Sequence, residues 1–192
     1  PDAERTMVTF LGIAGKINAK DINEKAVQES EVIFLEGYLW DEGEPKSAFD
    51  KAMSLSNTKA MSLSDQFCVE RHKDDFLDLV KNKLDITFAN EQEIKSLINT
   101  TNFEEVIKFG KQLGKILIIT RGELGSVAII HDEVIECDSK KNLNIIDLTG
   151  AGDLFAAGYL HGHINNLSIK ESLEKGTEMS SRIIQKVGAR LN

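Results

Sequence analysis

Short apolar runs alternate along this chain with longer stretches of helical periodicity. The strand-length runs occupy residues 32–35, 59–63, 85–89 and 116–120, and the first three are each followed by a segment with helical periodicity. Residues 66–84 and 103–113 place most of their apolar side chains on one face, as expected for helices that cover a sheet. This alternation predicts an α/β fold with a mostly parallel central sheet flanked by helices.

The pattern changes after residue 125. The apolar runs 126–130 and 133–137 are separated by the two polar residues His131 and Asp132, which predicts a β-hairpin. Two helices are expected afterwards, at about 152–163 and 168–186. The chain has 2 Pro and no Ser/Gly-rich tract that would mark a linker. Residues 1–192 are therefore expected to belong to a single domain.

Composition narrows the function classes. A chain of 192 residues with 41% hydrophobic and 28% charged residues is typical of a globular domain. The formal net charge of −8 disfavours a nucleic-acid surface, which needs clustered Lys and Arg. No apolar run approaches the roughly 20 residues of a membrane helix, and the two cysteines, Cys68 and Cys137, are too far apart for a metal knuckle or a redox pair. We expect a cytoplasmic protein without nucleic-acid or membrane partners.

The segment Asp147–Asp153 carries the clearest chemical pattern. It follows a short apolar segment that is expected to be a strand, and it leads into a predicted amphipathic helix that ends near His163. Three small residues, 150–152, allow several backbone N–H groups to point at one spot, where the start of a helix also favours an anion. Asp153 falls in the first helical turn, close enough to accept a proton from an attacking hydroxyl. A structural connection without a ligand is the alternative interpretation.

Two further polar segments follow predicted strands, at the edge where ligands bind in parallel sheets. Asn90 and Glu93 follow the strand at 85–89, and Thr120, Gly122 and Gly125 follow the strand at 116–120. An acidic first helical turn explains the former pair equally well, and turn geometry alone explains the glycines. Asp65, at the same edge, is favoured as a helix N-cap over a phosphate-positioning residue.

The heptapeptide 147–153 resembles the D-T-x-G-A-G-D signature of the ribokinase-like (PfkB) carbohydrate kinase family. The resemblance implies a three-layer αβα ribokinase-like fold and ATP-dependent transfer of the γ-phosphate to a hydroxymethyl group of a sugar or nucleoside. It makes Asp153 the general base, and the backbone of Gly150, Ala151 and Gly152 the anion hole for the transferred phosphate. Leu148 departs from the usual residues of the signature and removes a hydroxyl.

The same resemblance assigns cofactor roles at the strand ends. Asn90 and Glu93 match the family's N-x-x-E motif, which organises Mg²⁺ and its waters. Thr120, Gly122 and Gly125 match a T-x-G-x-x-G segment that lines the ATP site.

Gly188 lies in a segment similar to the family's K-x-G-A loop, which borders the adenine and a monovalent-cation site. The candidate ligands for that cation, K⁺ being the example, are the side chains of Asp147 and Thr149 with the carbonyl groups of Ile183, Lys186 and Gly188.

The resemblance runs from about residue 32 to residue 188 and matches the later part of the family's fold. Residues 1–192 are thus expected to be the C-terminal major part of a single kinase domain, without the upstream strands and the β lid through which family members dimerise. Residues 1–12 resemble a mid-fold strand of adenosine-kinase-like members, which would let Arg5 approach the acceptor, although a charge at the strand edge is the simpler interpretation of Arg5. The acceptor stays open, since the segment that selects it lies upstream.

Two other functions stand beside the kinase hypothesis. A non-catalytic nucleotide- or sugar-binding regulator with the same fold is the main alternative, although the presence of Asp153, Asn90 and Glu93 favours an enzyme. A dinucleotide-dependent oxidoreductase is disfavoured, because no G-x-G-x-x-G follows an early strand.

Overall fold

The computed structural model describes residues 8–40 and 44–191. The strands are β1 (Ile33–Glu36), β2 (Lys59–Ser62), β3 (Ile86–Asn90), β4 (Ile116–Thr120), β5 (Ser126–Ile130) and β6 (Glu133–Cys137). The α-helices are α1 (Glu24–Glu29), α2 (Pro45–Leu55), α3 (Gln66–Arg71), α4 (Lys73–Asp78), α5 (Glu91–Ile98), α6 (Phe103–Leu113), α7 (Ala151–Ile164) and α8 (Ile169–Ile183). Short 3₁₀ turns occur at η1 (Ala14–Lys16), η2 (Ala19–Asp21), η3 (Gly37–Trp40) and η5 (Gly122–Leu124), and η4 (Leu79–Lys83) is a π-helical turn.

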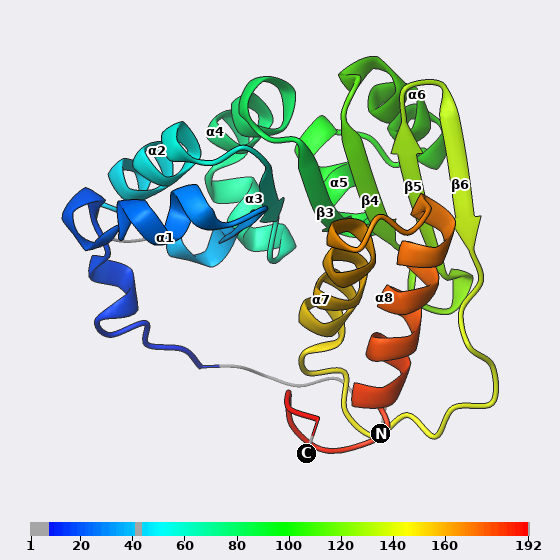
Figure 1. Cartoon of the computed structure of the whole chain (residues 1–192). Helices are drawn as coiled ribbons and strands as arrows, with labels where there is room; N and C mark the ends of the chain where they lie inside the picture. Colours follow the sequence, from blue (N-terminus) through cyan, green and yellow to red (C-terminus); the bar gives the residue numbers. More distant parts are fainter. Residues whose placement is uncertain (1–7, 41–43, 192) are drawn as a thin grey trace. The chain divides into compact units, whose positions relative to one another are not determined.

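The strands form a six-stranded sheet in the order β1-β2-β3-β4-β5-β6. The pairings of β1 with β2 and of β2 with β3 are parallel, with Phe34 beside Ala60 and Met61 beside Thr87. The strands β5 and β6 run in opposite directions and are joined by a turn at His131 and Asp132 (Figure 1). The predicted α/β class, the mostly parallel sheet and the late β-hairpin are confirmed.

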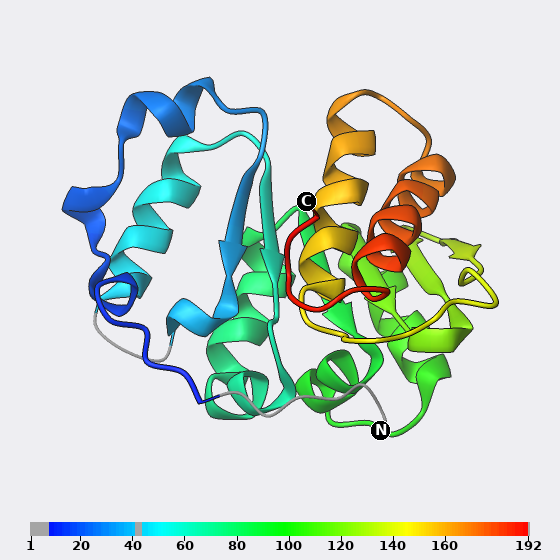
Figure 2. The same cartoon turned by 90° about the horizontal axis from the view of Figure 1, so that it is seen from below.

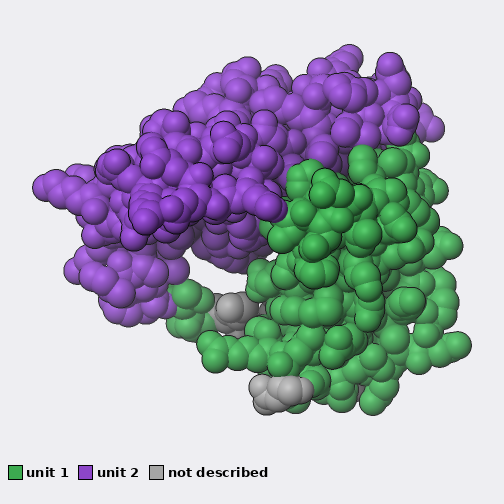
Figure 3. All heavy atoms as spheres, viewed as in Figure 1, with its two compact units in different colours: residues 1–9, 120–128, 134–192 green, residues 10–119, 129–133 purple. Residues whose placement is uncertain are grey.

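The chain divides into two compact units, which are described separately. Unit 1 comprises residues 1–9, 120–128 and 134–192, and unit 2 comprises residues 10–119 and 129–133 (Figure 3). An aromatic cluster forms part of the core of unit 2, where the ring centroid of Trp40 lies 5.1 Å from that of Phe49 and 6.0 Å from that of Phe76. The Trp40 indole N–H donates to the Asp75 carboxylate at 3.0 Å, which satisfies the polar atom of this ring.

The long helix predicted over residues 66–84 is wrong as a single element. It is divided into α3, α4 and η4, because His72 leaves the helical conformation at φ −121° and ψ 28°. The apolar face continues through the break, and Val69, Phe76 and Leu84 are all fully buried. The apolar periodicity thus predicts which face packs on the core, but it does not predict whether the helix is continuous.

Close contact between α7 and α8 dominates the helical part of unit 1, and Figures 1 and 2 show the two helices side by side. A Cβ atom at Gly158 would lie 2.5 Å from the carbonyl oxygen of Lys175, and one at Gly176 would lie 2.8 Å from that of Phe155. Glycines at these positions let the two backbones approach without side-chain clash. The packing fixes α7, whose first turn contains Asp153.

The expected strand near the N-terminus is not observed where it can be assessed. Residues 1–7, including Arg5, lie outside the described residues, and residues 8–12 form no strand. Among the described residues, no helix is long and apolar enough to span a membrane.

Candidate active site

The start of α7 forms the first part of the candidate site. Gly150 is the N-cap residue and has a left-handed backbone with φ +79°. A Cβ atom at Gly150 would lie 2.9 Å from the Cβ of Ala189. Both the positive φ and this short distance therefore disfavour a side chain at Gly150. A Cβ atom at Gly152 would meet no atom within 4 Å. The protein itself therefore leaves space beside the backbone of Gly152.

Hydrogen bonds at this helix start define which groups can receive an anion. The N–H of Ala151 donates to the carbonyl oxygen of Leu148 at 3.2 Å. Helix geometry leaves the N–H groups of the first turn, including those of Gly152 and Asp153, without intrahelical acceptors. Asp153 is exposed in the same turn. The loop thus combines N–H donors, the positive end of a helix and a carboxylate.

Asp147 joins this loop to the C-terminal segment. One of its carboxylate oxygens accepts hydrogen bonds from the Thr149 N–H at 2.9 Å and the Thr149 hydroxyl at 2.6 Å. The other oxygen accepts the Gly188 N–H at 2.9 Å. The carbonyl oxygen of Ile184 also accepts the N–H of Ile146 at 2.8 Å. The segment 184–189 therefore holds the loop 146–150 from one side, an arrangement that the sequence did not reveal.

A cavity of about 450 Å³ lies in unit 1 beside the start of α7. It brings together Thr120, Gly122 and Gly125 with Ala151 and Gly152, all of which were singled out from the sequence. No contact with a ligand was assigned from the sequence to the remaining lining residues, which are Glu123, Ser139, Lys140, Lys141, Asn142, Leu143, Ile145, Leu148, Phe155, Thr177, Ser180, Ser181 and Ile184. The short strand expected before Asp147 is wrong, because residues 143–148 form no helix or strand. The apolar side chains of this segment line the cavity instead, and their recurrence was the available sequence signal.

Apolar and polar groups are both present on the wall of this cavity. Leu143, Ile145, Leu148, Phe155 and Ile184 provide apolar surface, whereas Lys140 and Lys141 provide positive charge. Ligand sites are commonly apolar hollows with a few convergent polar groups. The cavity can therefore accept an aromatic ring together with an anionic group.

Asn90 and Glu93, in unit 2, are locked into a reciprocal helix cap at the start of α5. The Asn90 side chain accepts the Glu93 N–H at 2.8 Å, and the Glu93 carboxylate accepts the Asn90 N–H at 2.9 Å. A further bond runs from the Asn90 amide to the other Glu93 oxygen at 2.6 Å. This capping box confirms that Asn90 and Glu93 have a structural role at the start of the helix. It does not exhaust the lone pairs of the carboxylate, which can still accept bonds from water.

The environment of Glu93 is unusual for a carboxylate. Glu93 is 5% exposed, and its burial raises its pKa to about 7. The charges of Asp65 and Glu36 also raise this pKa, whereas the hydrogen bonds from Asn90 lower it. Asp65 caps α3, as expected from the sequence, because its carboxylate accepts the Cys68 N–H at 2.6 Å. Negative charge thus gathers around Glu93, which is the setting that a hydrated cation would stabilise.

Among the residues that the structure describes, no group of three or more His, Cys, Asp or Glu side chains is arranged to hold a metal ion directly. The candidate Mg²⁺ residues are in unit 2, and the candidate phosphate and nucleotide residues are in unit 1.

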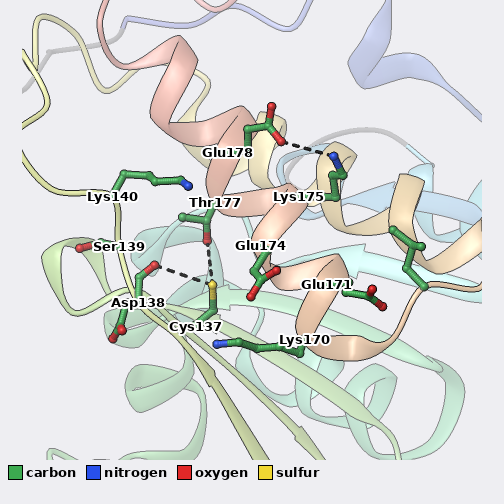
Figure 4. Close-up of a pocket in the computed structure, with 11 residues that line it drawn as sticks. Cys137, Asp138, Ser139, Lys140, Lys170, Glu171, Glu174, Lys175, Thr177 and Glu178 are labelled. Atoms are coloured by element: carbon green, nitrogen blue, oxygen red, sulfur yellow. Dashed lines mark hydrogen bonds and ion pairs between the residues drawn. The ribbon is translucent and has the colours of Figure 1, made fainter.

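A second cavity, of about 670 Å³, lies along α8 and the end of β6 in unit 1 (Figure 4). Its wall carries charges of both signs, among them Lys140, Lys175, Glu174 and Glu178. Cys137 is buried there, with its sulfur 3.5 Å from the Thr177 hydroxyl. Sequence reasoning assigned no functional role to the residues that line this cavity.

Comparisons with known proteins agree with this geometry. The structure is similar to an adenosine kinase from Sinorhizobium meliloti, with a TM-score of 0.90 and 33% identity over 92% of this chain and 56% of that one. It is also similar to a probable sugar kinase from Rhizobium etli CFN 42, with a TM-score of 0.88 and 35% identity over 91% of this chain and 54% of that one. The chain thus spans about half the length of these two proteins.

In sequence, the chain is 35% identical over 107 residues to a ribokinase from Lactococcus lactis, a match that covers 55% of this chain and 34% of the ribokinase. The relatives are thus kinases of sugars and of nucleosides, in keeping with the kinase hypothesis. The model of the pfkB family of carbohydrate kinases matches residues 1–192. The chain therefore belongs to the pfkB carbohydrate kinase family.

Proposed function

We propose that the protein is an ATP-dependent phosphotransferase that transfers the γ-phosphate to a hydroxymethyl group of a sugar or nucleoside. The observation that carries this proposal is the start of α7, where Asp153 follows directly on a glycine with open space beside its backbone. A carboxylate and helix N–H donors in one turn match the two requirements of phosphoryl transfer to an alcohol. These are a base for the hydroxyl proton and donors for the phosphate charge.

In the proposed reaction, Asp153 accepts the proton of the acceptor hydroxyl. The hydroxyl oxygen then forms a bond to the γ-phosphorus while the bond from phosphorus to the β–γ bridging oxygen breaks, and ADP leaves. The N–H groups at the start of α7 stabilise the charge on the γ-phosphate oxygens. Positioning and electrostatics account for most of the catalysis in such transfers.

The cavity of about 450 Å³ is proposed as the ATP site. Its apolar wall of Leu143, Ile145 and Phe155 suits a purine ring, and Lys140 suits phosphate oxygens. Gly122, at φ +56°, has no atom within 4 Å of its Cβ position, so a ligand can also approach this backbone. Thr120, Gly122 and Gly125 are accordingly proposed to contact the nucleotide.

Kinases of the pfkB family use ATP with Mg²⁺. The residues present fit this ion, because Asn90 and Glu93 offer hard oxygen ligands and the carboxylates of Asp65 and Glu36 act on Glu93. We propose that Asn90 and Glu93 hold Mg²⁺ through water. A Mg²⁺ ion held by these residues would supply positive charge of the kind that stabilises phosphate oxygens.

A monovalent cation such as K⁺ is proposed at Asp147 and Thr149. Support comes from the oxygen atoms that gather there, since the Asp147 carboxylate and the Thr149 hydroxyl are 2.6 Å apart. The Gly188 N–H bond to Asp147 also draws the C-terminal segment, with its carbonyl groups, to the same place.

A nucleoside is the acceptor favoured by the likeness to the Sinorhizobium meliloti adenosine kinase, which extends over 92% of this chain at a TM-score of 0.90. Adenosine is therefore the first acceptor to test, followed by ribose and fructose. The likeness to a probable sugar kinase keeps sugars in the panel.

The test is ADP formation by the protein, measured with a panel of nucleosides and sugars and with Mg²⁺ present. The Asp153→Asn variant should lose about 10²- to 10⁴-fold in kcat, the usual contribution of a general base, with little change in ATP affinity. Near-normal turnover of this variant would show that the base assignment is wrong. ATP binding without ADP formation across the panel would favour a non-catalytic regulator instead.

A further inference from the structure

We infer that Ser139 and Lys141 are positioning residues that hold the turn at residues 120–125 in place for nucleotide binding. Both act through one atom, the backbone carbonyl oxygen of Glu123. This inference rests on the proposed ATP site and concerns how the protein keeps that site in shape. Glu123, Ser139 and Lys141, with the hydrogen bonds that join them, are called the Glu123 clamp below.

The Glu123 clamp consists of three hydrogen bonds. The Ser139 hydroxyl donates to the carbonyl oxygen of Glu123 at 2.7 Å. The Lys141 ammonium donates to the same oxygen at 3.3 Å and to the Ser139 hydroxyl at 3.1 Å. Ser139 therefore donates to the turn while it accepts from Lys141, and each bond supports the other. The clamp joins two segments that lie 16 to 18 residues apart in the sequence.

The turn joins β4 to β5, and its own backbone is short and glycine-rich. Gly122 and Gly125 both have left-handed backbones, with φ +56° and +87°. Internal bonds run from the Arg121 N–H to the Gly125 carbonyl oxygen at 2.8 Å and from the Gly125 N–H to the Gly122 carbonyl oxygen at 3.0 Å. These bonds shape the turn, and the clamp ties it in addition to the segment that follows β6. The exposed Leu124, 67% accessible, adds no apolar anchor.

A second contact confirms that the turn is pressed against the segment that follows β6. A Cβ atom at Gly125 would clash with the carbonyl oxygen of Cys137 and lie 2.9 Å from the backbone nitrogen of Ser139. Glycine at this position lets the two backbones meet, and the clamp holds them together a few residues away. The turn and the segment 137–141 therefore pack together and are expected to move as one unit.

The turn and this segment form part of the wall of the proposed ATP site. Ser139 and Lys141 line the same cavity as Gly122, Glu123 and Gly125. Ser139 also borders the second cavity, where Figure 4 shows it between Asp138 and Lys140. Loss of the clamp should therefore loosen the wall against which the nucleotide binds. Asp153 and the start of α7 are outside the clamp, so the chemical step should be largely unaffected.

The expected effect is a change in nucleotide affinity without a matching change in turnover. Removal of one net hydrogen bond corresponds to about 2- to 12-fold in an equilibrium constant. The Ser139→Ala variant should raise the Kd and the KM for ATP by this factor. Its kcat at saturating ATP should stay within about 2-fold, as should its KM for the acceptor, because the binding contribution that is removed is equal in the ground state and in the transition state. The Ser139→Thr variant keeps the hydroxyl and should restore ATP affinity.

The experiment uses the full-length protein and compares Ser139→Ala, Ser139→Thr and Lys141→Met with a matched control. Lys170→Met is the control, because the Lys170 ammonium also donates to a backbone carbonyl of this region, that of Glu136, at 2.6 Å, but Lys170 does not line the ATP cavity. Binding of Mg·ATP is measured by calorimetry, and KM and kcat are measured by ADP formation. The melting temperature of each variant is recorded in parallel.

The outcomes separate this inference from the proposed function. If the unmodified protein binds no ATP, the proposed ATP site is wrong, and the clamp fails with it. If the unmodified protein binds ATP and Ser139→Ala binds it equally well, the clamp inference alone is overturned. The same holds if Ser139→Ala and Lys170→Met lower the melting temperature and ATP affinity to the same extent, because that result means a general loss of stability.

Discussion

Glu93 offers a prediction about the pH dependence of folding. This side chain is 95% buried, since it is 5% exposed, and its burial is the main cause that raises its pKa from 4.5 to about 7. The carboxylates of Asp65 and Glu36 raise the pKa further, and the hydrogen bonds from Asn90 oppose them. The folded protein thus favours the protonated form of Glu93.

The size and the sign of the effect follow from linkage. In the unfolded chain Glu93 has its ordinary pKa of 4.5, so between pH 4.5 and pH 7 the folded state binds more protons than the unfolded state. The contribution of Glu93 to stability is therefore fully present below pH 4.5 and is lost as the pH rises through 7. The difference of about 2.5 pKa units corresponds to about 3 kcal/mol of unfolding free energy across this window.

The assay is urea unfolding of the protein at a series of pH values from 4.5 to 8, without Mg²⁺. The Glu93→Gln variant, which cannot ionise, should remove most of the decline in stability that occurs between pH 5 and pH 7.5. The control is Glu104→Gln, because Glu104 is an exposed glutamate in the first turn of α6 and should leave the decline unchanged. Equal slopes for the unmodified protein and Glu93→Gln would refute the reasoning, because Glu93 would then not titrate in this range.

Two glycine substitutions distinguish packing from ligand binding. Gly152→Ala should leave the melting temperature unchanged or slightly raised, since its Cβ meets no atom within 4 Å and Ala favours a helix, yet it should weaken Mg·ATP binding measured by calorimetry. An unchanged affinity would mean that no phosphate approaches this backbone. Gly158→Ala should cost about 1–3 kcal/mol in urea unfolding, because its Cβ would lie 2.5 Å from the Lys175 carbonyl oxygen. Ala157→Ser, at an exposed position of the same helix, is its control.

Much of the fold could be predicted from the sequence because its strands are short, apolar and bounded by polar residues. The predicted strand at 116–120 and both strands of the hairpin have the observed bounds. The helix break at His72 could not be predicted, since the residues around it keep a continuous apolar face. The periodicity arises because apolar side chains are buried, and this pattern is insensitive to a local change of backbone conformation.

Only part of the candidate site could be predicted from the sequence. The physical reason differs from the one that applies to the helix break at His72. Asp153 and Gly150 belong to one contiguous segment, so their spacing could be read directly. The bond from the Gly188 N–H to Asp147 spans 41 residues, and a backbone N–H has no sequence signature. The clamp of Ser139 on Glu123 likewise involves a carbonyl group, which every residue has. Backbone contacts between residues far apart in the sequence therefore could not be predicted from the sequence.

The two glycines that flank Ala151 show how the structure refines a motif. Gly150 is required by the protein itself, through its φ of +79° and the nearby Ala189 side chain. Gly152 meets no such requirement, because it lies in a helix and has free space around its Cβ position. A glycine that costs helix stability and serves no packing purpose needs another reason, and close approach of a ligand to the backbone is the one that this site offers. In the proposed function, the contact with the ligand is therefore assigned to Gly152 and its neighbour Asp153, whereas Gly150 mainly shapes the loop that presents them.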